Sequence, residues 1–397
     1  MGTTLLRTGL TGACLVLAAG IAVEQSRSAI VTEGKGLDFA PLRSAGAALV
    51  HGLSIYADRR FVYPPTAAVA LIPTTLGRYA AALDVWLVVS AAAVGVAGLI
   101  AIAPWRGALW PLLSALGACI LLKSDVLTDT LWLGNLSLLL APVAVGVLLL
   151  FEARHWRTGI ALLMLSLLIK PLLIPLVLIP LLQREWRPLA DAIVVAAVLL
   201  GAAILLVPGG GHFVAVIGYL DGGSSLRGAE AVYNISIHGL AQRFALGAWA
   251  TAARVIVIAT AAGIAVMWAR RPASPGSVAA MGALLLLAFL LAGSLSEDHY
   301  LLVAAPCVLA ALALSRKPLG MIGALPGLLL VAFPRHEFGN VGNLAQDLQI
   351  RYFLAEVALA VAAAMIVWES MRVRRAPGAH ALATERGQPV VGQSSVA

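Results

Sequence analysis

The sequence predicts an all-α polytopic membrane protein, and three observations carry this prediction: the composition, a series of apolar segments, and the grouping of the basic residues. Of 397 residues, 61% are hydrophobic and only 12% are charged. The mean hydropathy of +0.94 is far above that of soluble globular domains. The composition therefore excludes an ordinary soluble enzyme or binding domain.

The net charge of +8 would suggest a nucleic-acid partner in a soluble chain. Here the basic residues stand in short clusters between apolar segments, as membrane topology requires, so we predict no nucleic-acid partner. The three cysteines, Cys14, Cys119 and Cys307, lie in apolar segments without metal-ligand spacing. Neither a disulfide framework nor a zinc site is predicted.

The apolar segments approach the roughly 17–25 residues that a membrane-spanning helix needs. They lie near 5–23, 80–103, 108–123, 132–151, 189–207, 251–269, 277–294, 300–314, 319–333 and 353–369. The first segment could be a signal peptide because Arg7 stands ahead of its apolar run and small residues follow, but an uncleaved first helix is favoured. We predict a single domain over 1–375, a bundle of about ten to twelve helices, and a disordered cytoplasmic tail over 376–397.

The basic clusters predict the orientation of the bundle. By the positive-inside rule they mark the cytoplasmic face of a multi-pass protein of the cytoplasmic (inner) membrane. The clusters are Arg106, Arg154 with Arg157, Arg184 with Arg187, Arg270 with Arg271, Arg316 with Lys317, and Arg372 with Arg374 and Arg375. Polar loops at 24–65, 124–131, 208–250, 295–299 and 334–352 then fall on the opposite face. We therefore expect the active site in external, periplasmic loops.

Lys170 stands inside the apolar stretch LLIKPLLIPLVLIPLLQREWR. A charge at membrane depth costs about 2.5–3.5 kcal/mol on insertion scales and indicates a functional site, unless the lysine snorkels to the surface. Basic clusters flank 158–182 at both ends, and three prolines disfavour one straight helix. The simplest geometry is a helical hairpin with Lys170 near its tip, facing protein or a hydrated cavity; a pair of full crossings is the alternative.

Asp38 follows the first apolar segment, in the first predicted external loop, where it would lie at the mouth of a membrane cavity. A carboxylate there can act as a general base toward a sugar hydroxyl, or it can be an ordinary loop aspartate. In the same loop, Tyr63 precedes two prolines and is pushed into an extended conformation. Arg59 and Arg60 can bind phosphate or hold a lipid headgroup.

Polar side chains recur in the later external segments. Asp125 and Asp129 share a face if helical and could bind a metal or a sugar hydroxyl, whereas Asn135 suggests a buried hydrogen bond to substrate or to another helix. Asn234 and His238 can bind sugar hydroxyls or cap a surface helix.

The segment SLSEDHYLL contains Glu297, Asp298, His299 and Tyr300 at the external end of a helix. His299 beside two carboxylates could be protonated and balance a phosphate, or it could be structural.

In order along the chain, the stretches DFAPLRSAGAALVHGLSIY, FVYPP, TDTLWLGNLSLLLAPV, GIALLMLSLLIKPLLIPLVLIPLLQREWRPL, YNISIHGL and EDHYLLVAAP resemble the polyprenyl-phosphate-sugar-dependent glycosyltransferases of the GT-C superfamily. Within that superfamily the chain is most similar to glycosyltransferase family 87. The similarity covers most of residues 30–310, and the lysine-proline segment is its most specific part.

The resemblance implies a GT-C type transmembrane bundle, a donor sugar linked through phosphate to a polyprenol, and a glycan or glycolipid acceptor. Asp38 matches the acidic residue proposed as the base of an inverting transfer, and Lys170 matches the lysine-proline motif. The negative charge of the leaving phosphate would be balanced by Lys170, His299 and one of Arg43, Arg59 or Arg60. Tyr63, Asp129, Asn135, Asn234, His238 and Tyr300 are expected to bind substrate. No cofactor is certain, although a divalent metal could substitute for the cations.

Two branches of the family compete. The pattern Asp-Phe-x-Pro at 38–41 and the lysine-proline stretch are similar to the mycobacterial arabinofuranosyltransferase branch, which uses decaprenyl-phosphoarabinofuranose to build the arabinan of arabinogalactan and lipoarabinomannan. His299-Tyr300 is closer to the polyprenyl-phosphomannose-dependent mannosyltransferases, which act on lipoglycans or phosphatidylinositol mannosides. A transporter of polyprenyl-linked sugars and a non-catalytic scaffold are further alternatives.

Overall fold

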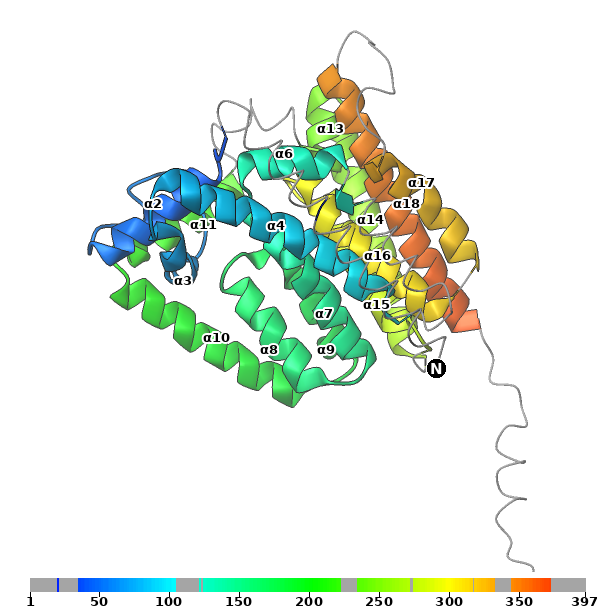
Figure 1. Ribbon diagram of the computed structural model, residues 1–397. Helices are drawn as coiled ribbons and strands as arrows, with labels where there is room; N and C mark the ends of the chain where they lie inside the picture. Colours follow the sequence, from blue (N-terminus) through cyan, green and yellow to red (C-terminus); the bar gives the residue numbers. More distant parts are fainter. Residues whose placement is uncertain are drawn as a thin grey trace, which may run out of the picture.

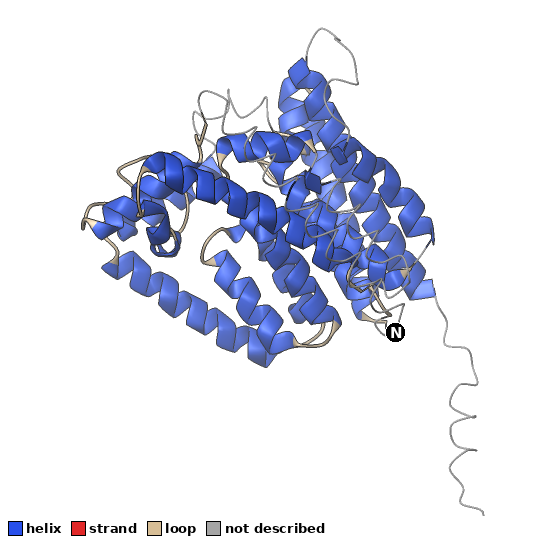
Figure 2. Cartoon of the chain, viewed as in Figure 1, coloured by secondary structure: helices blue, strands red, loops and turns tan. Residues whose placement is uncertain are grey.

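The computed structural model describes residue 20 and residues 35–104, 121–122, 124–222, 234–271, 274–316, 318–332 and 344–372. Within these ranges every regular element is a helix, and an isolated bridge pairs Asn234 with Glu297 (Figure 2). This confirms the predicted all-α class. The predicted segments 5–23 and 108–123, except residues 20 and 121–122, and the predicted tail 376–397 lie outside the described residues.

The helices run in the order shown in Figure 1. They are α2 (Phe39–Val50), α3 (Pro65–Ala70), η1 (Ile72–Thr75), α4 (Tyr79–Ile102), α6 (Asp125–Leu133), η2 (Leu136–Leu139), α7 (Leu140–Glu152), α8 (Trp156–Leu167), η3 (Pro171–Val177), α9 (Leu178–Leu182), α10 (Trp186–Leu206), η4 (Gly210–His212), α11 (Phe213–Gly222), α13 (Ile237–Arg243), α14 (Gly247–Ala269), α15 (Ser277–Ala292), η5 (Asp298–Tyr300), α16 (Leu301–Ser315), α17 (Pro318–Ala332) and α18 (Leu344–Arg372).

Among the described residues, five helices are long and apolar enough to cross a membrane, and a sixth span results if the bent pair of α6 with η2–α7 counts as one. The five are α4, α10, α14, Asp298–Ser315 and Gln349–Arg372. Shorter apolar helices, among them α8 and α15, pack with them. The protein is therefore a polytopic membrane protein, while the predicted total of ten to twelve helices stays a prediction.

The core of the bundle is formed by α15 and α16, in which nearly every side chain is buried. They contact α7 and α18, and α17 packs on the outer side of α18 (Figure 1). In contrast, α10 and α14 expose most of their apolar side chains. An apolar helix with an exposed surface is stable where lipid surrounds it, so these two helices form the lipid-facing boundary.

The arginine clusters gather at one end of the bundle. Arg154 donates to Gln183 (Nη1 to Oε1, 3.1 Å), which ties the α7–α8 turn to the end of α9. Glu152 accepts from the backbone N–H of Gly276 at 2.8 Å, at the start of α15. A Cβ on Gly276 would in turn lie 2.6 Å from the backbone nitrogen of Ser315, so the end of α16 belongs to the same group.

We call this end of the molecule the arginine end. Of the predicted clusters, Arg154 with Arg157 and Arg184 with Arg187 lie together at this end. Arg270 with Arg271 and Arg316 stand in the chain close to Gly276 and Ser315 at the same end, and the side of Arg372 stays a prediction. Arg106, Lys317, Arg374 and Arg375 lie outside the described residues.

The hairpin predicted over 158–182 is confirmed. Its first arm is α8, the chain leaves the helix at Leu168, and the return arm is η3 followed by α9. The return begins as a 3-10 helix because Pro171 and Pro175 lack N–H donors. Both ends lie at the arginine end, so Lys170 lies at the opposite tip.

Several segments predicted as loops are helices instead. The predicted loop 24–65 contains α2, which buries Phe39, Leu42 and Ala45 on one face. Likewise α6, α11, α13 and the start of α18 occupy predicted loops. These short helices escaped prediction because each is shorter than a span or joined to a polar segment. The predicted span 132–151 also starts later, since α6 ends at Leu133 and the chain bends by 116° before η2.

Candidate active site

Asp38 is fixed by backbone contacts at the end of the bundle opposite the arginine end. It is the N-cap residue of α2. Its N–H donates to the carbonyl of Leu133 at 2.8 Å, and the N–H of Gly36 donates to Trp132 at 2.9 Å. These bonds hold the entry to α2 against the end of α6. The carboxylate stays half-buried, so it is both positioned and reachable.

The break between α6 and η2 places Asn135 beside this carboxylate. Gly134 has a φ of 73°, the left-handed conformation that ends α6. Asn135 then donates from Nδ2 to Oδ2 of Asp38 at 2.6 Å, and its Oδ1 accepts from the N–H of Ser137 at 2.9 Å. The buried amide thus joins two segments 97 residues apart.

Lys170 reaches the same place from the tip of the hairpin. Because it precedes Pro171, it is extended, with φ −148° and ψ 120°. Its Nζ donates to Oγ of Ser137 at 2.6 Å and lies 3.5 Å from Oδ1 of Asn135. The lysine therefore faces protein groups rather than lipid.

Two tyrosine rings flank the ammonium group of Lys170. Its Nζ lies 5.6 Å from the ring centroid of Tyr63 and 5.0 Å from that of Tyr300, within cation–π range. Tyr63 stands just before α3, where the hydroxyl of Tyr56 donates to its carbonyl at 2.7 Å. We call the group Asp38, Tyr63, Asn135, Ser137, Lys170 and Tyr300 the Asp38–Lys170 cluster.

Charged groups surround the cluster. Lys170 interacts electrostatically with the carboxylates of Asp38 and Glu297. Burial raises the pKa of Asp38 above its usual value of 3.8, while the hydrogen bond from Asn135 and the charges of Lys170 and Arg60 act in the opposite direction. A raised pKa makes the carboxylate a stronger base than a free aspartate.

His299 lies next to the cluster, and Glu297 connects the imidazole of His299 with it. The imidazole is 1% exposed, and its Nε2 lies 3.2 Å from Oε2 of Glu297. Its ring meets that of Tyr300 edge-on, with centroids 4.4 Å apart. His299 therefore contacts the cluster through Tyr300 and Glu297, and its predicted contact with the donor phosphate stays a prediction.

Asn234 holds the backbone around Glu297. Its Nδ2 donates to the carbonyl of Ser294 at 2.8 Å, and its Oδ1 accepts from the N–H groups of Ser236 and Ser296. Its carbonyl accepts from the side chain of Gln349. The side-chain amide of Asn234 therefore bonds to backbone groups, and Asn234 supports the segment that carries Glu297.

Other predicted residues lie apart from these contacts. Arg43 donates to the carbonyls of Thr74 at 2.5 Å and Gly77 at 2.9 Å. Arg60 pairs with Asp58, its Nη2 2.9 Å from Oδ2, and its charge reaches Asp38. Arg59 is exposed.

Asp129 is half-buried on α6, so the helix that was only a condition for its shared face with Asp125 is present. His238 lies on α13, with its Nε2 2.8 Å from Nε2 of Gln242. Substrate binding by Asp129 and His238 stays a prediction. Within the described ranges, no group of three or more His, Cys, Asp or Glu side chains could hold a metal ion.

One member of the cluster, Ser137, was not singled out from the sequence, and Glu297 was noted there only as a neighbour of His299. Ser137 lies two residues after Asn135, in an apolar run where a serine needs a partner. Glu297 lies two residues before His299, and its position beside Lys170 depends on a contact between α6–η2, the hairpin and η5. The signal for Ser137 was present in the sequence GNLS, whereas for Glu297 only its neighbours pointed to it.

Gly134→Ala should destabilise the protein by about 2–3 kcal/mol or more, because it adds left-handed strain and a steric clash. A Cβ at this position would lie 2.8 Å from Cβ of Phe39. Gly52→Ala is the matched control, since Gly52 has a φ of 68° and a Cβ added there would meet nothing within 4 Å. Thermal unfolding of the purified proteins in detergent measures both. Equal losses of stability would show that the contact with Phe39 does not constrain the site.

Comparison with known proteins identifies the family of this chain. The family model of glycosyltransferase family 87 matches residues 61–294, more than half of the chain. Two α-(1→3)-arabinofuranosyltransferases of Mycobacterium tuberculosis, from strains CDC 1551 / Oshkosh and ATCC 25618 / H37Rv, are each 26% identical to it over 257 residues. The alignment covers 62% of this chain and 57% of each relative, so it spans little more than half of their length. No solved structure matches the chain significantly.

The matched region contains Tyr63, Asn135, Ser137 and Lys170 of the cluster, together with the whole hairpin. The resemblance noted in the sequence is thereby confirmed. This polytopic membrane protein belongs to glycosyltransferase family 87.

Proposed function

We propose that this protein is an inverting membrane glycosyltransferase that transfers arabinofuranose from a polyprenyl-phosphate donor, decaprenyl-phosphoarabinofuranose, to a cell-envelope arabinan. The observation that carries the proposal is the convergence of a carboxylate and an ammonium group on Asn135. Its amide donates to Asp38 at 2.6 Å and accepts, at 3.5 Å, from Lys170. A base and a cation a few ångströms apart are what transfer from a sugar phosphate requires.

The reaction has one displacement step in this proposal. The acceptor hydroxyl attacks the anomeric carbon while Asp38 removes its proton, so a carbon–oxygen bond forms to the acceptor. The bond between the anomeric carbon and the phosphate oxygen breaks, and its electron pair leaves with the polyprenyl phosphate. Attack opposite the leaving group inverts the anomeric configuration.

Lys170 stabilises the phosphate as its negative charge increases on departure. Electrostatic stabilisation is strongest in a site from which water is excluded, and the tip of the hairpin brings the ammonium group into such surroundings. Tyr63 and Tyr300 hold the ammonium group in place and offer flat faces for the donor. Arg60 adds positive charge near Asp38.

The site is proposed to face the outside of the membrane. It lies at the end of the bundle opposite the arginine end, and the positive-inside rule makes the arginine end cytoplasmic. An external site fits an acceptor glycan of the cell envelope and a donor whose polyprenyl chain stays in the bilayer.

Transfer assays with two purified donors test the proposal. With a synthetic arabinan acceptor, decaprenyl-phosphoarabinofuranose should give product, and with a mannoside acceptor polyprenyl-phosphomannose should give none. Transfer from the mannose donor alone would instead favour the mannosyltransferase branch, to which His299-Tyr300 is similar. Failure with both donors, in protein that binds them, would favour transport of a polyprenyl-linked sugar.

A further inference from the structure

Two turns at the arginine end repeat one sequence pattern and one conformation. The sequences are Arg154-His155-Trp156-Arg157 and Arg184-Glu185-Trp186-Arg187. The first arginine of each has a positive φ, 64° and 63°. The next N–H donates to the carbonyl five residues earlier, from His155 to Leu150 at 2.8 Å and from Glu185 to Pro180 at 2.9 Å. Each turn then begins a helix, α8 or α10, at its tryptophan.

Glycine is the residue that such a turn favours. The five-residue backbone bond with a left-handed residue is the Schellman helix ending, which usually has glycine at the left-handed position. Arg154 and Arg184 are strained there relative to glycine. The backbone shape of the two turns therefore does not require the arginines. The side chain of Arg154 contacts Gln183 and the ring of Trp156, and the rest of its charge remains available at the surface.

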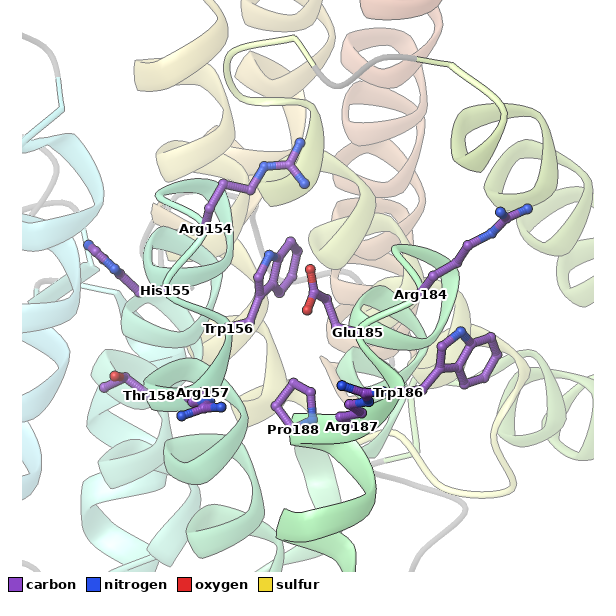
Figure 3. Close-up of a pocket in the computed structure, with 10 residues that line it drawn as sticks. All are labelled: Arg154, His155, Trp156, Arg157, Thr158, Arg184, Glu185, Trp186, Arg187 and Pro188. Atoms are coloured by element: carbon purple, nitrogen blue, oxygen red, sulfur yellow. The ribbon is translucent and has the colours of Figure 1, made fainter.

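The two turns face each other across an open cavity of about 610 Å³ (Figure 3). Two tryptophans, the carboxylate of Glu185 and four arginines line it. The arginines are Arg154, Arg157, Arg184 and Arg187. All four arginines are exposed. The guanidinium of Arg154 lies over the ring of Trp156, 5.5 Å from its centroid. The cavity is therefore strongly positive and open to an anion at the membrane surface.

An apolar groove continues from this cavity. A second hollow of about 460 Å³ lies between α8 and α10 and shares Arg157 and Pro188 with the first. It extends to Leu168 and Leu199, and Asp191 is its only carboxylate among the described lining residues. From Arg157 to Leu168, a helix rises about 17 Å, roughly half of the 30 Å hydrocarbon core. The groove is thus as long as one leaflet.

We propose that the two turns and the groove bind one anionic phospholipid of the surrounding leaflet. The arginines hold its phosphate, the tryptophans lie at the level of the headgroup, and one acyl chain occupies the groove between α8 and α10. A polyprenyl phosphate presents the same charged group, but its chain is far longer than a groove of one leaflet. The bound lipid joins both ends of the hairpin that holds Lys170 at its tip.

Native mass spectrometry of the full chain, titrated with phosphatidylglycerol or phosphatidylcholine, tests the proposal. One phosphatidylglycerol should bind in preference to phosphatidylcholine. The double variant Arg154→Gly/Arg184→Gly keeps both turns and should bind it about 30-fold more weakly, as expected for two arginines near a membrane surface. Glycine relieves the left-handed strain of both turns, which offsets the lost hydrogen bond from Arg154 to Gln183. The unfolding temperature should therefore stay close to that of the parent, which separates lost binding from misfolding.

The matched control is Arg270→Ala/Arg271→Ala, which removes two exposed arginines from the same end but outside both hollows. Its binding should stay within about threefold of the parent. Equal binding of the two phospholipids, or equal losses in the two double variants, would overturn the site. Displacement of phosphatidylglycerol by a lower concentration of decaprenyl phosphate would overturn the assignment to a phospholipid. None of these readouts depends on glycosyl transfer.

Discussion

Asp38→Asn should lower the turnover of sugar transfer by about 10²–10⁴-fold, the usual contribution of a general base. The amide cannot accept the proton of the acceptor hydroxyl. It can still accept the hydrogen bond from Asn135, so the fold around the site should remain. Steady-state kinetics with the arabinose donor, together with thermal unfolding of the same preparation, measure the two effects separately.

Asp84→Asn is the matched control for this variant. Asp84 is an exposed carboxylate on the first turns of α4, and turnover should stay within about twofold because its surface charge is solvated.

In the parent protein, turnover should fall as the pH is lowered through the pKa of Asp38, since protonation removes the base. That acid limb lies above pH 3.8, because burial raises this pKa. Full turnover in Asp38→Asn would leave the carboxylate with a structural role.

Lys170→Met should lower turnover by about 10²–10³-fold, the loss seen when one group that stabilises the developing charge is removed. Methionine is of similar length and leaves the hairpin tip filled. The variant should also lose affinity for the product, polyprenyl phosphate, because in the proposed mechanism the ammonium group contacts the phosphate before and after transfer. Product inhibition constants measure this directly, and Asp38→Asn should leave them nearly unchanged.

Two further variants help to interpret the effect of Lys170→Met. Lys170→Arg keeps the positive charge and should retain part of the affinity for polyprenyl phosphate. Lys35→Met removes another lysine at the same end of the molecule and should change neither the turnover nor the product inhibition constant. If Lys170→Met lowered turnover without weakening product inhibition, the lysine would act by positioning Asp38 through Asn135 rather than by contacting phosphate.

The large features of the fold follow from the sequence. α4, α10 and α14 were predictable because each is an apolar run of spanning length. The hairpin was predictable because arginines flank it at both ends and prolines interrupt it. In contrast, α2 was not predictable. Its twelve residues form one buried face within a polar segment, and only the packed structure reveals that face.

Most members of the site were predictable from the sequence, but their contacts were not. Asp38 and Lys170 were conspicuous as charges beside or within apolar segments, and a buried hydrogen bond was anticipated for Asn135. The contact between Asn135 and Asp38 depends on the left-handed turn at Gly134 and on packing over 97 residues of sequence. The backbone contacts of Asn234 and Arg43 likewise depend on tertiary packing, which a single sequence does not encode in any local pattern.

The orientation of the Asn135 amide has a stereochemical consequence. Its Oδ1 faces the N–H of Ser137 and the ammonium group of Lys170, both donors, so its Nδ2 must point toward Asp38. Oδ2 of Asp38 is thereby committed as an acceptor. Within the part of the chain that the structure describes, no hydrogen bond occupies Oδ1. In the proposed mechanism Oδ1 is then the oxygen that takes the proton, so the acceptor hydroxyl should approach Asp38 from the Oδ1 side.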